Sequence, residues 1–354
     1  MSSIKVSIII PVYNVERYLR ECLESVINQT LEQIQIIIVN DASPDNSWKI
    51  IEEYKNRNPK IEVLTHEQNL GANESRNTGL SAVKGQYIFF LDNDDTISLD
   101  ACEKLYNIAV QHDADIVGCP IRRTDISNTE TLRTDYFNNK EIREYIGEDI
   151  YQAYFRGLIS ITIAAKLYKL DIWNRINSVE IPSGTIHEDN YLFFDLTGVC
   201  HRFVQTNYVC YNHRQHNKSI TGRVISEKYI TDCLIVLKKQ KDFFASGNFK
   251  AETLKNSANR IQHALRAQCI LPNNMAIYNP ETIRFLLHKA PEYGLEEEVI
   301  TEIINCFDIL VTGRKREPLA DWWYQFGQKK LKGKAKMIVK RVIQFLAGKR
   351  RTPY

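Results

Sequence analysis

The chain has 354 residues, of which 44% are apolar and 25% charged, as in a soluble globular protein of one large or two smaller domains. No segment reaches the roughly 20 consecutive apolar residues of a transmembrane helix, which excludes an integral membrane protein of that type. The net charge of +3 is unevenly distributed, because residues 314–354 carry +11 and the remainder −8. Such asymmetry predicts a polyanionic partner for the tail.

The cysteine pattern and the N-terminus indicate where the protein works. The eight cysteines are widely spaced and include no C-x-x-C pair, so we expect reduced, mostly buried thiols. The first eleven residues contain one lysine and a short apolar run that ends at Pro11, which does not fit a signal peptide. We therefore expect a cytoplasmic protein.

The first 120 residues alternate short β-rich runs with helical patterns. This alternation predicts an α/β fold with a mostly parallel sheet. Ligands of such sheets bind at the carboxyl ends of the strands. The expected strands are Lys5–Pro11, Gln35–Asn40, Ile61–Thr65, Tyr87–Leu91 and Asp115–Cys119, and the expected helices are Val15–Gln29, Ser47–Asn56, Asn73–Val83 and Asp100–Gln111.

Polar residues follow the second expected strand. The segment Asp45–Ser47 suits the N-cap of the next helix. Asp41 lies too close to the strand end to cap that helix. It is a candidate acceptor for a nucleobase or a ribose, and a purely structural turn is an equally good interpretation of this residue alone.

A glycine turn at Gly71 precedes the third expected helix, which carries Arg76 in its first turns. A cation at a helix start opposes the helix dipole, so we expect an anion close to Arg76. A donor phosphate and the aspartates that follow the next strand are both candidates.

Three carboxylates follow the fourth expected strand, in the segment Asp92-Asn93-Asp94-Asp95. Asp92 and Asp94 should project to the same side of extended backbone and repel each other unless a cation compensates. Oxygen ligands suit Mg²⁺ or Mn²⁺, which proteins bind through one or two carboxylates together with substrate phosphates. Capping of the next turn could explain one aspartate, and we favour a metal-phosphate site for the cluster.

After residue 121 the pattern becomes less regular, with a polar loop, a helix expected near Lys140–Phe155, and a mixed segment to about residue 220. In this segment Glu188-Asp189 precedes the apolar run 191–194. Acidic residues are common in the first turn of a helix, which could by itself account for either one. His187 is more often a packed residue than a ligand, and we leave it out of the metal set.

From Ser226 onward the chain is expected to be wholly helical, with helices at 226–245, 250–270, 279–289, 295–311 and 334–347. Residues 327–351 hold ten Lys or Arg and no acid, and their apolar residues are spaced as one helical face. A basic amphipathic helix suits an anionic membrane surface. Docking of its apolar stripe on the body is the alternative. Nucleic acid is a weaker candidate, because no recognised binding module accompanies the charge.

Four motifs in order resemble those of family 2 glycosyltransferases, which have the A-type fold and use nucleotide sugars. The motifs are Val6–Asn14, Asn40–Ser47, Asn69–Asn77 and Phe90–Asp95, and the resemblance continues more thinly through Tyr211–Gln215. It implies a catalytic domain over 1–222, with a nucleotide-binding half (1–120) and an acceptor-binding half (121–222). The helical region 223–354 would follow it.

The resemblance implies a set of donor-binding residues. Pro11, Tyr13 and Asp41 would hold the uracil and the ribose, Arg76 would lie near the base or the diphosphate, and Asp92 would face the ribose or the sugar. The family usually has two aspartates and a glycine where this chain has Asn40-Asp41-Ala42. This departure loses one charge and a glycine but keeps Asp41, the aspartate that matters most for the nucleobase and ribose.

The resemblance also implies the chemistry. Asp94 would be the principal ligand of Mn²⁺ or Mg²⁺, with Asp95 supporting it, and Asp189 would be the general base. We expect an inverting glycosyltransferase that acts on a hydroxyl of a glycan or a lipid-linked glycan, in cell-surface polysaccharide synthesis.

Two other classes of function remain as alternatives. A non-catalytic sugar-nucleotide or glycan-binding scaffold would be favoured by loss of Asp94 or Asp189, and both are present. A nucleotidyltransferase should have a loop rich in glycine and arginine after the first strand, where this chain has Pro11–Asn14. A dinucleotide-dependent oxidoreductase would need a G-x-G-x-x-G there.

Overall fold

The computed structural model describes residues 3–124, 130–132, 142–176, 188–215, 226–265, 280–299 and 302. The chain divides into two compact units, Met1–Arg223 and Val224–Tyr354. This division lies beside the boundary that the sequence predicts at residue 222. The candidate site residues all belong to the first unit.

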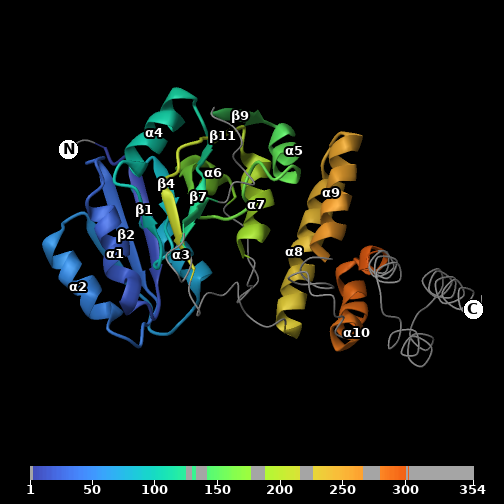
Figure 1. The fold of residues 1–354 in the computed structure, drawn as a ribbon, viewed down its shortest axis with the longest axis horizontal. Coiled ribbons are helices and arrows are strands. Elements are labelled where there is room, and N and C mark those ends of the chain that lie inside the picture. The colour runs from blue at the N-terminus through green and yellow to red at the C-terminus, as the bar shows by residue number, and fades with distance from the viewer. Residues whose placement is uncertain are drawn as a thin grey trace, which may run out of the picture. The chain divides into compact units, whose positions relative to one another are not determined.

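The first unit is built on an eight-stranded sheet with the strand order β3-β2-β1-β4-β10-β6-β11-β9 (Figure 1). The first four strands in this order are parallel to one another. As a result their carboxyl ends meet at one edge, where ligands bind. These strands are β1 (Val6–Val12), β2 (Ile34–Asn40), β3 (Ile61–Thr65) and β4 (Tyr87–Phe90), within two residues of the predicted bounds.

The other half of this sheet mixes directions. β10 runs antiparallel to both β4 and β6, whereas β11 is parallel to β6. The insertion of β10 brings its residues beside the end of β4, so the second half of the unit contributes to the same sheet edge. The bounds are β6 (Ile116–Gly118), β9 (Arg143–Ile146), β10 (Lys166–Lys169) and β11 (Arg202–Gln205).

The helix expected near Lys140–Phe155 is wrong in its first half. Residues Arg143–Ile146 form β9, which pairs antiparallel with β11 at the edge of the sheet. Gly147, at φ 56°, separates this strand from a short helix, α5 (Asp149–Phe155). Pairing with a strand almost 60 residues away replaced the helix, because tertiary contacts override local propensity.

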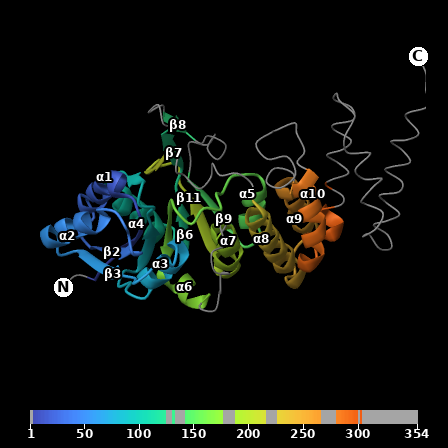
Figure 2. The ribbon, with the colours of Figure 1, turned by 90° about the horizontal axis from the view of Figure 1, so that it is seen from below.

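Helices cover both faces of the sheet, as Figures 1 and 2 show together. The alternating side chains of β1 explain this arrangement. Ile8 and Ile10 belong to the core shared with α1, α2 and α4, whereas Ile9 lies against α3 on the opposite face. The bounds are α1 (Glu16–Ile27), α2 (Ser47–Arg57), α3 (Ala72–Leu80) and α4 (Ala101–Gln111).

A second, four-stranded sheet has the order β5-β12-β7-β8. It connects the segment after β4 to a late part of the unit, because β5 pairs with β12. The turn that holds the aspartate cluster lies between β4 and β5, and this pairing anchors it. The strands are β5 (Thr96–Ile97), β7 (Ile121–Thr124), β8 (Glu130–Leu132) and β12 (Tyr211–Arg214).

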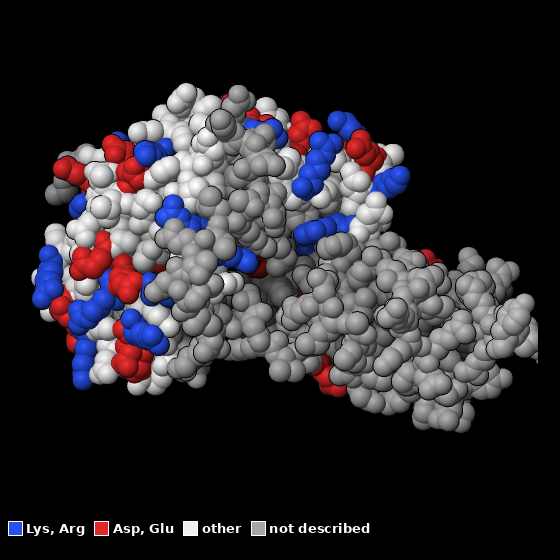
Figure 3. All heavy atoms as spheres, viewed as in Figure 1, with Lys and Arg blue, Asp and Glu red and all other residues white. Residues whose placement is uncertain are grey.

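Two further helices complete the first unit: α6 (Leu170–Arg175) and α7 (Glu188–Val199). Trp173 on α6 stacks near Phe90 and Tyr168, and the ring centroids lie 5.2 and 5.6 Å apart. These rings pack on the sheet face that α3 also covers. On the face shown in Figure 3, acidic and basic side chains are interspersed over the described part of this unit.

The second unit is helical in its described residues, as the sequence predicts. Its helices are α8 (Glu227–Ser246), α9 (Ala251–Ala264) and α10 (Pro280–Lys289), followed by the 3₁₀ helix η5 (Ala290–Tyr293). Buried apolar residues from all four elements form its core. Most of the helix expected at 295–311, and all of that expected at 334–347 with the basic tail, lie outside the described residues.

Two further expectations from the sequence concern membrane-spanning helices and the state of the cysteines. None of the described helices combines the length and the apolar character needed to cross a membrane. Six of the eight cysteines fall within the described ranges, and all six are buried and free of disulfide bonds.

Candidate functional site

The site lies at the carboxyl edge of the parallel strands, where three loops adopt unusual backbone conformations. Asn14 after β1 and Ala42 after β2 have positive φ values of 51° and 53°, and Ala165 immediately before β10 has φ 57°. Such conformations are unfavourable for residues with a Cβ and tend to occur at functional sites. Asp45 accepts hydrogen bonds from the amides of Ser47 and Glu16, at 3.0 and 2.8 Å, and so serves the starts of α1 and α2.

Asp41 is buried at the end of β2 and organises the loop between β3 and α3. Its Oδ1 accepts from the amide of Leu70 and contacts Nδ1 of His66, both at 2.8 Å, and its Oδ2 accepts from the amide of Gly71 at 2.8 Å. His66 Nε2 lies 2.8 Å from the hydroxyl of Thr78 on α3. Asp41 therefore has a structural role, and its contact with a nucleobase or ribose stays a prediction.

Pro11 and Tyr13 lie at the end of β1, as predicted. The carbonyl of Pro11 accepts a hydrogen bond from Asn93 Nδ2 at 2.7 Å, which ties the end of β1 to the aspartate turn. Tyr13 is 43% exposed, and Leu70 in the β3–α3 loop is 44% exposed. Exposed aromatic and apolar groups at this edge are suited to contact a planar ring.

Arg76 joins the third loop to the aspartate cluster. Its guanidinium is buried, and Nη2 donates to Oδ1 of Asp92 at 2.9 Å. Of the two anions that the sequence offers for Arg76, the structure therefore supplies the aspartate. Burial raises the pKa of Asp189 and the charge of Arg76 opposes that effect, so this charge acts on both carboxylates.

Asp95 is directed into the protein rather than into the turn. Its side chain is 1% exposed, Oδ1 accepts from the amide of Arg214 at 2.8 Å, and Oδ2 lies 3.1 Å from His213 Nδ1. Burial raises the pKa of Asp95, and the contact with His213 opposes that effect. Both oxygens are thus used to anchor β12, and the role predicted for Asp95 in supporting a metal ion stays a prediction.

Asp94 is half-buried in the turn between β4 and β5. Its charge raises the pKa of Asp95, of His213 and of Cys22, so it contributes to a region of negative potential. Among the described residues no group of three or more His, Cys, Asp or Glu side chains is arranged as a complete metal site. The binding of Mn²⁺ or Mg²⁺ by Asp94 stays a prediction.

His213 was not singled out from the sequence. Burial lowers its pKa, but the hydrogen bond and charge of Asp95, with the charges of Asp92 and Asp94, outweigh burial and raise it. A histidine that donates one ring nitrogen to a carboxylate presents the other to a ligand or metal. The only signal in the sequence is the short motif around Tyr211–Gln215, 118 residues beyond Asp95.

Asp189 lies in the first turn of α7, partly buried. The amide and the side chain of Asn190 donate to its Oδ1 at 2.8 and 2.9 Å, and within the described part of the chain Oδ2 accepts no hydrogen bond. Burial raises the pKa of Asp189, while Asn190, Arg76 and Lys166 act in the opposite direction. A carboxylate with a raised pKa is suited to accept a proton.

Known proteins resemble this chain in sequence and in fold. The family described as Glycosyl transferase family 2 matches residues 7–170. The putative glycosyltransferase EpsH of Bacillus subtilis (strain 168) is 32% identical over 257 residues, which cover 71% of this chain and 72% of EpsH. Glycosyltransferase GlyA of Streptococcus pneumoniae serotype 4 is 30% identical over 70% of this chain, but the chain spans only 36% of GlyA.

A solved structure shares the fold. The structure of S. aureus TarS 1–349 in complex with UDP has a TM-score of 0.62 and 18% identity, covering 88% of this chain and 93% of that chain. At this identity the likeness establishes the A-type fold and nothing beyond it. The sequence match to EpsH, the family match and the shared fold together show that the chain belongs to the family 2 glycosyltransferases.

Proposed function

We propose that this glycosyltransferase moves a sugar from a uridine-diphosphate donor to a hydroxyl of a glycan or lipid-linked glycan, with inversion at the anomeric carbon. The observation that carries the proposal is the position of Arg76. Its guanidinium binds Asp92 at 2.9 Å and its charge acts on Asp189. One buried cation thus links the aspartate cluster, suited to a diphosphate, with a carboxylate suited to remove a proton.

The donor half of the proposal rests on the sheet edge. Tyr13 and Leu70 offer exposed apolar surface to a base, and the network of Asp41 holds the loop that carries Leu70. Structures of the fold relative TarS contain UDP and UDP-GlcNAc. We infer from that relative a uridine nucleotide as the donor class for this chain.

A divalent cation is part of the proposal. Asp94 would hold Mn²⁺ or Mg²⁺ together with the donor diphosphate, Asp95 would support the site by anchoring β12, and His213 is a further candidate ligand. The bound ion would stabilise negative charge on the departing nucleotide.

The acceptor half of the proposal assigns one proton transfer. Asp189 would take the proton of the acceptor hydroxyl while that oxygen attacks the anomeric carbon opposite the leaving diphosphate. A single displacement of this kind inverts the anomeric configuration. Removing such a base costs on the order of 10²–10⁴ in rate.

The test is a panel of nucleotide sugars assayed for release of nucleoside diphosphate, with Mn²⁺ or with a chelator. We expect release from a UDP-sugar that needs the metal, is nearly abolished in Asp94→Asn and is strongly reduced in Asp189→Asn. The anomeric configuration of the product, read by NMR, tests inversion separately. Turnover that survives both substitutions would show that these residues are not the site.

A further inference from the structure

Lys166 is a buried cation that has no part in the donor and acceptor roles proposed above. It is the first residue of β10, it is 3% exposed, and its ammonium donates to the carbonyl of Thr162. Lysine is almost never fully buried unless its charge is compensated. Thr162 is itself partly exposed, so water could replace the lysine at that carbonyl.

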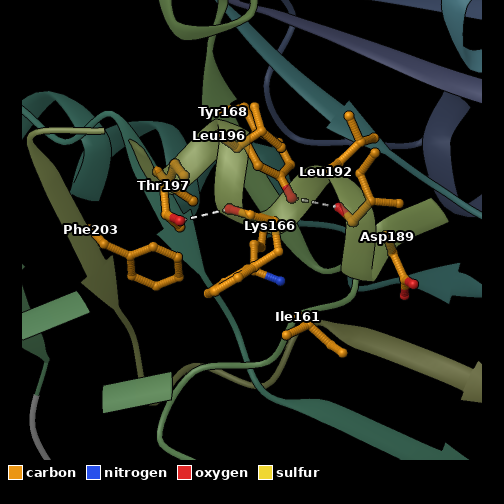
Figure 4. Close-up of a pocket in the computed structure, with 11 residues that line it drawn as sticks. Ile161, Lys166, Tyr168, Asp189, Leu192, Leu196, Thr197 and Phe203 are labelled. Carbon is orange, nitrogen blue, oxygen red and sulfur yellow. Dashed lines mark hydrogen bonds between the residues drawn. The ribbon is translucent and has the colours of Figure 1, made fainter. Parts of the chain in front are cut away.

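A small cavity connects Lys166 with Asp189. Its volume is about 10 Å³, roughly the space of one water molecule. Figure 4 shows Lys166 entering it from β10 and Asp189 lying at its side from the start of α7, with the ammonium directed toward the side of Asp189. Apart from these two and Tyr168, the wall is mainly apolar, including Ile161, Leu192 and Phe203. In such surroundings charges act on each other over longer distances than in water.

The backbone holds Lys166 in this place at a conformational cost. Ala165 directly before it has φ 57°, where an L-residue with a Cβ is strained, and its carbonyl accepts from the amide of Cys119 at 3.0 Å. β10 is also fixed on both sides by β4 and β6. A strained junction that presents a buried charge to a cavity is typical of a functional position.

We propose that Lys166 is a positioning residue for the general base, and that its charge, acting across the cavity, keeps Asp189 in the deprotonated form that accepts the acceptor proton. This inference rests on the proposed role of Asp189. It makes Lys166 part of the reaction although it contacts neither donor nor acceptor in the proposed mechanism.

The surrounding charges support this assignment. Burial lowers the pKa of Lys166 to about 8, while Asp189 and Cys119 act to raise it, so the ammonium is still mostly charged at neutral pH. Arg76 is a further cation that opposes the effect of burial on the pKa of Asp189. The Tyr168 hydroxyl, whose pKa is raised by burial and by Asp189, donates to the carbonyl of Ile163 at 3.0 Å. Lys166 and Arg76 thus both contribute positive charge near this base.

The first experiment measures the pH dependence of kcat/KM for UDP release from UDP-N-acetylglucosamine, or from the donor that the panel identifies. Lys166→Met is expected to move the acid limb up by about one pH unit, which is roughly a tenfold loss of rate at a pH on that limb. Lys166→Arg retains the charge and should keep the limb near its wild-type position. Thr197→Val, which alters the same cavity wall without a charge, should leave it unchanged.

The second experiment needs no substrate. Urea unfolding midpoints are compared for wild type, Lys166→Met, Asp189→Asn and the double variant. Lys166→Met should raise the urea midpoint more in the Asp189→Asn background than in wild type. In that background the ammonium of Lys166 has lost a compensating anion, so its removal stabilises the protein more. Strictly additive midpoints, or an acid limb that Lys166→Met does not move, would overturn the proposal. Full activity of Asp189→Asn would instead show that Asp189 is not the general base. The measured charge coupling between Lys166 and Asp189 would still hold.

Discussion

Asp189 is expected to lower the stability of the folded protein, although it is needed for the proposed reaction. Burial raises its pKa in the folded chain above the ordinary value of about 3.9. Between these two pKa values the folded state binds more protons than the unfolded state, so this residue lowers the free energy of unfolding as pH rises through that window. The penalty is fully present above the folded-state pKa of Asp189.

Asp189→Asn is therefore predicted to raise the free energy of unfolding at pH 7 while it lowers kcat by on the order of 10²–10⁴. Chemical unfolding at pH 4 and pH 7, together with UDP release, measures both effects. The gain in stability should shrink toward pH 4, where the wild-type carboxyl is increasingly protonated. A variant that is less stable at pH 7 would indicate that the carboxylate is held for structural reasons.

Asp41, unlike Asp189, is expected to stabilise the folded protein, because its three contacts with His66 and with two amides all lie within the chain. Asp41→Ala leaves those donors unpaired in a buried region. We predict a loss of about 2–4 kcal/mol in the free energy of unfolding, and weaker UDP binding because the Leu70 loop loses its anchor. Denaturant unfolding and calorimetric titration with UDP check the two parts. Thr78→Val, which removes only the outer contact of His66, should cost less on both counts.

At the scale of elements, the packing of α3 on β1 controls where Arg76 lies. Gly79 faces Ile9 so closely that an added Cβ would lie 2.5 Å from Ile9 Cγ2. Gly79→Ala should therefore shift the helix and cost about 1–3 kcal/mol in stability. Because Arg76 is one turn earlier on the same face, donor affinity should fall as well.

The control for this prediction is Asn77→Ala, on the exposed side of α3. Its effect on the free energy of unfolding should stay within about 0.5 kcal/mol. Thermal unfolding and the KM for the donor distinguish the two variants. Equal effects of both substitutions would mean that close packing on Ile9 does not determine the position of this helix.

At the scale of the whole molecule, the two units have separate cores. Leu234 on α8 is fully buried in the core of the second unit. Leu234→Ala should lower the stability of that unit by about 2–5 kcal/mol, and calorimetry should resolve its transition moving away from that of the first unit. Nucleotide binding by the first unit should persist. A single transition that shifts as a whole would show that the units unfold together.

The basic C-terminal segment is a property of the chain that sequence alone describes. Its net charge of +11 over residues 314–354 predicts binding to anionic vesicles, with about 1 kcal/mol from each basic residue near the headgroups. Sedimentation with vesicles containing phosphatidylglycerol should capture the protein at low salt and release it at high salt. Equal binding to neutral vesicles would exclude this electrostatic attraction.

Local patterns by themselves determined much of this protein. The alternation of apolar runs located β1 to β4 and their helices, because strand and helix periodicities extend over only a few residues. The same reasoning located the aspartate cluster at a strand end, since polar residues directly after a buried strand mark the ligand edge of a parallel sheet. The helical character of the residues after 226 also followed from periodicity.

Only the tertiary structure decided which distant residues meet. β9 formed where a helix was expected because a strand far along the chain pairs with it. Asp95 faces β12 across 118 residues, and Lys166 shares a cavity with Asp189 although they belong to different elements. Such contacts leave no periodic trace in the sequence. They depend on the order of strands in the sheet, which is fixed by packing of the whole unit.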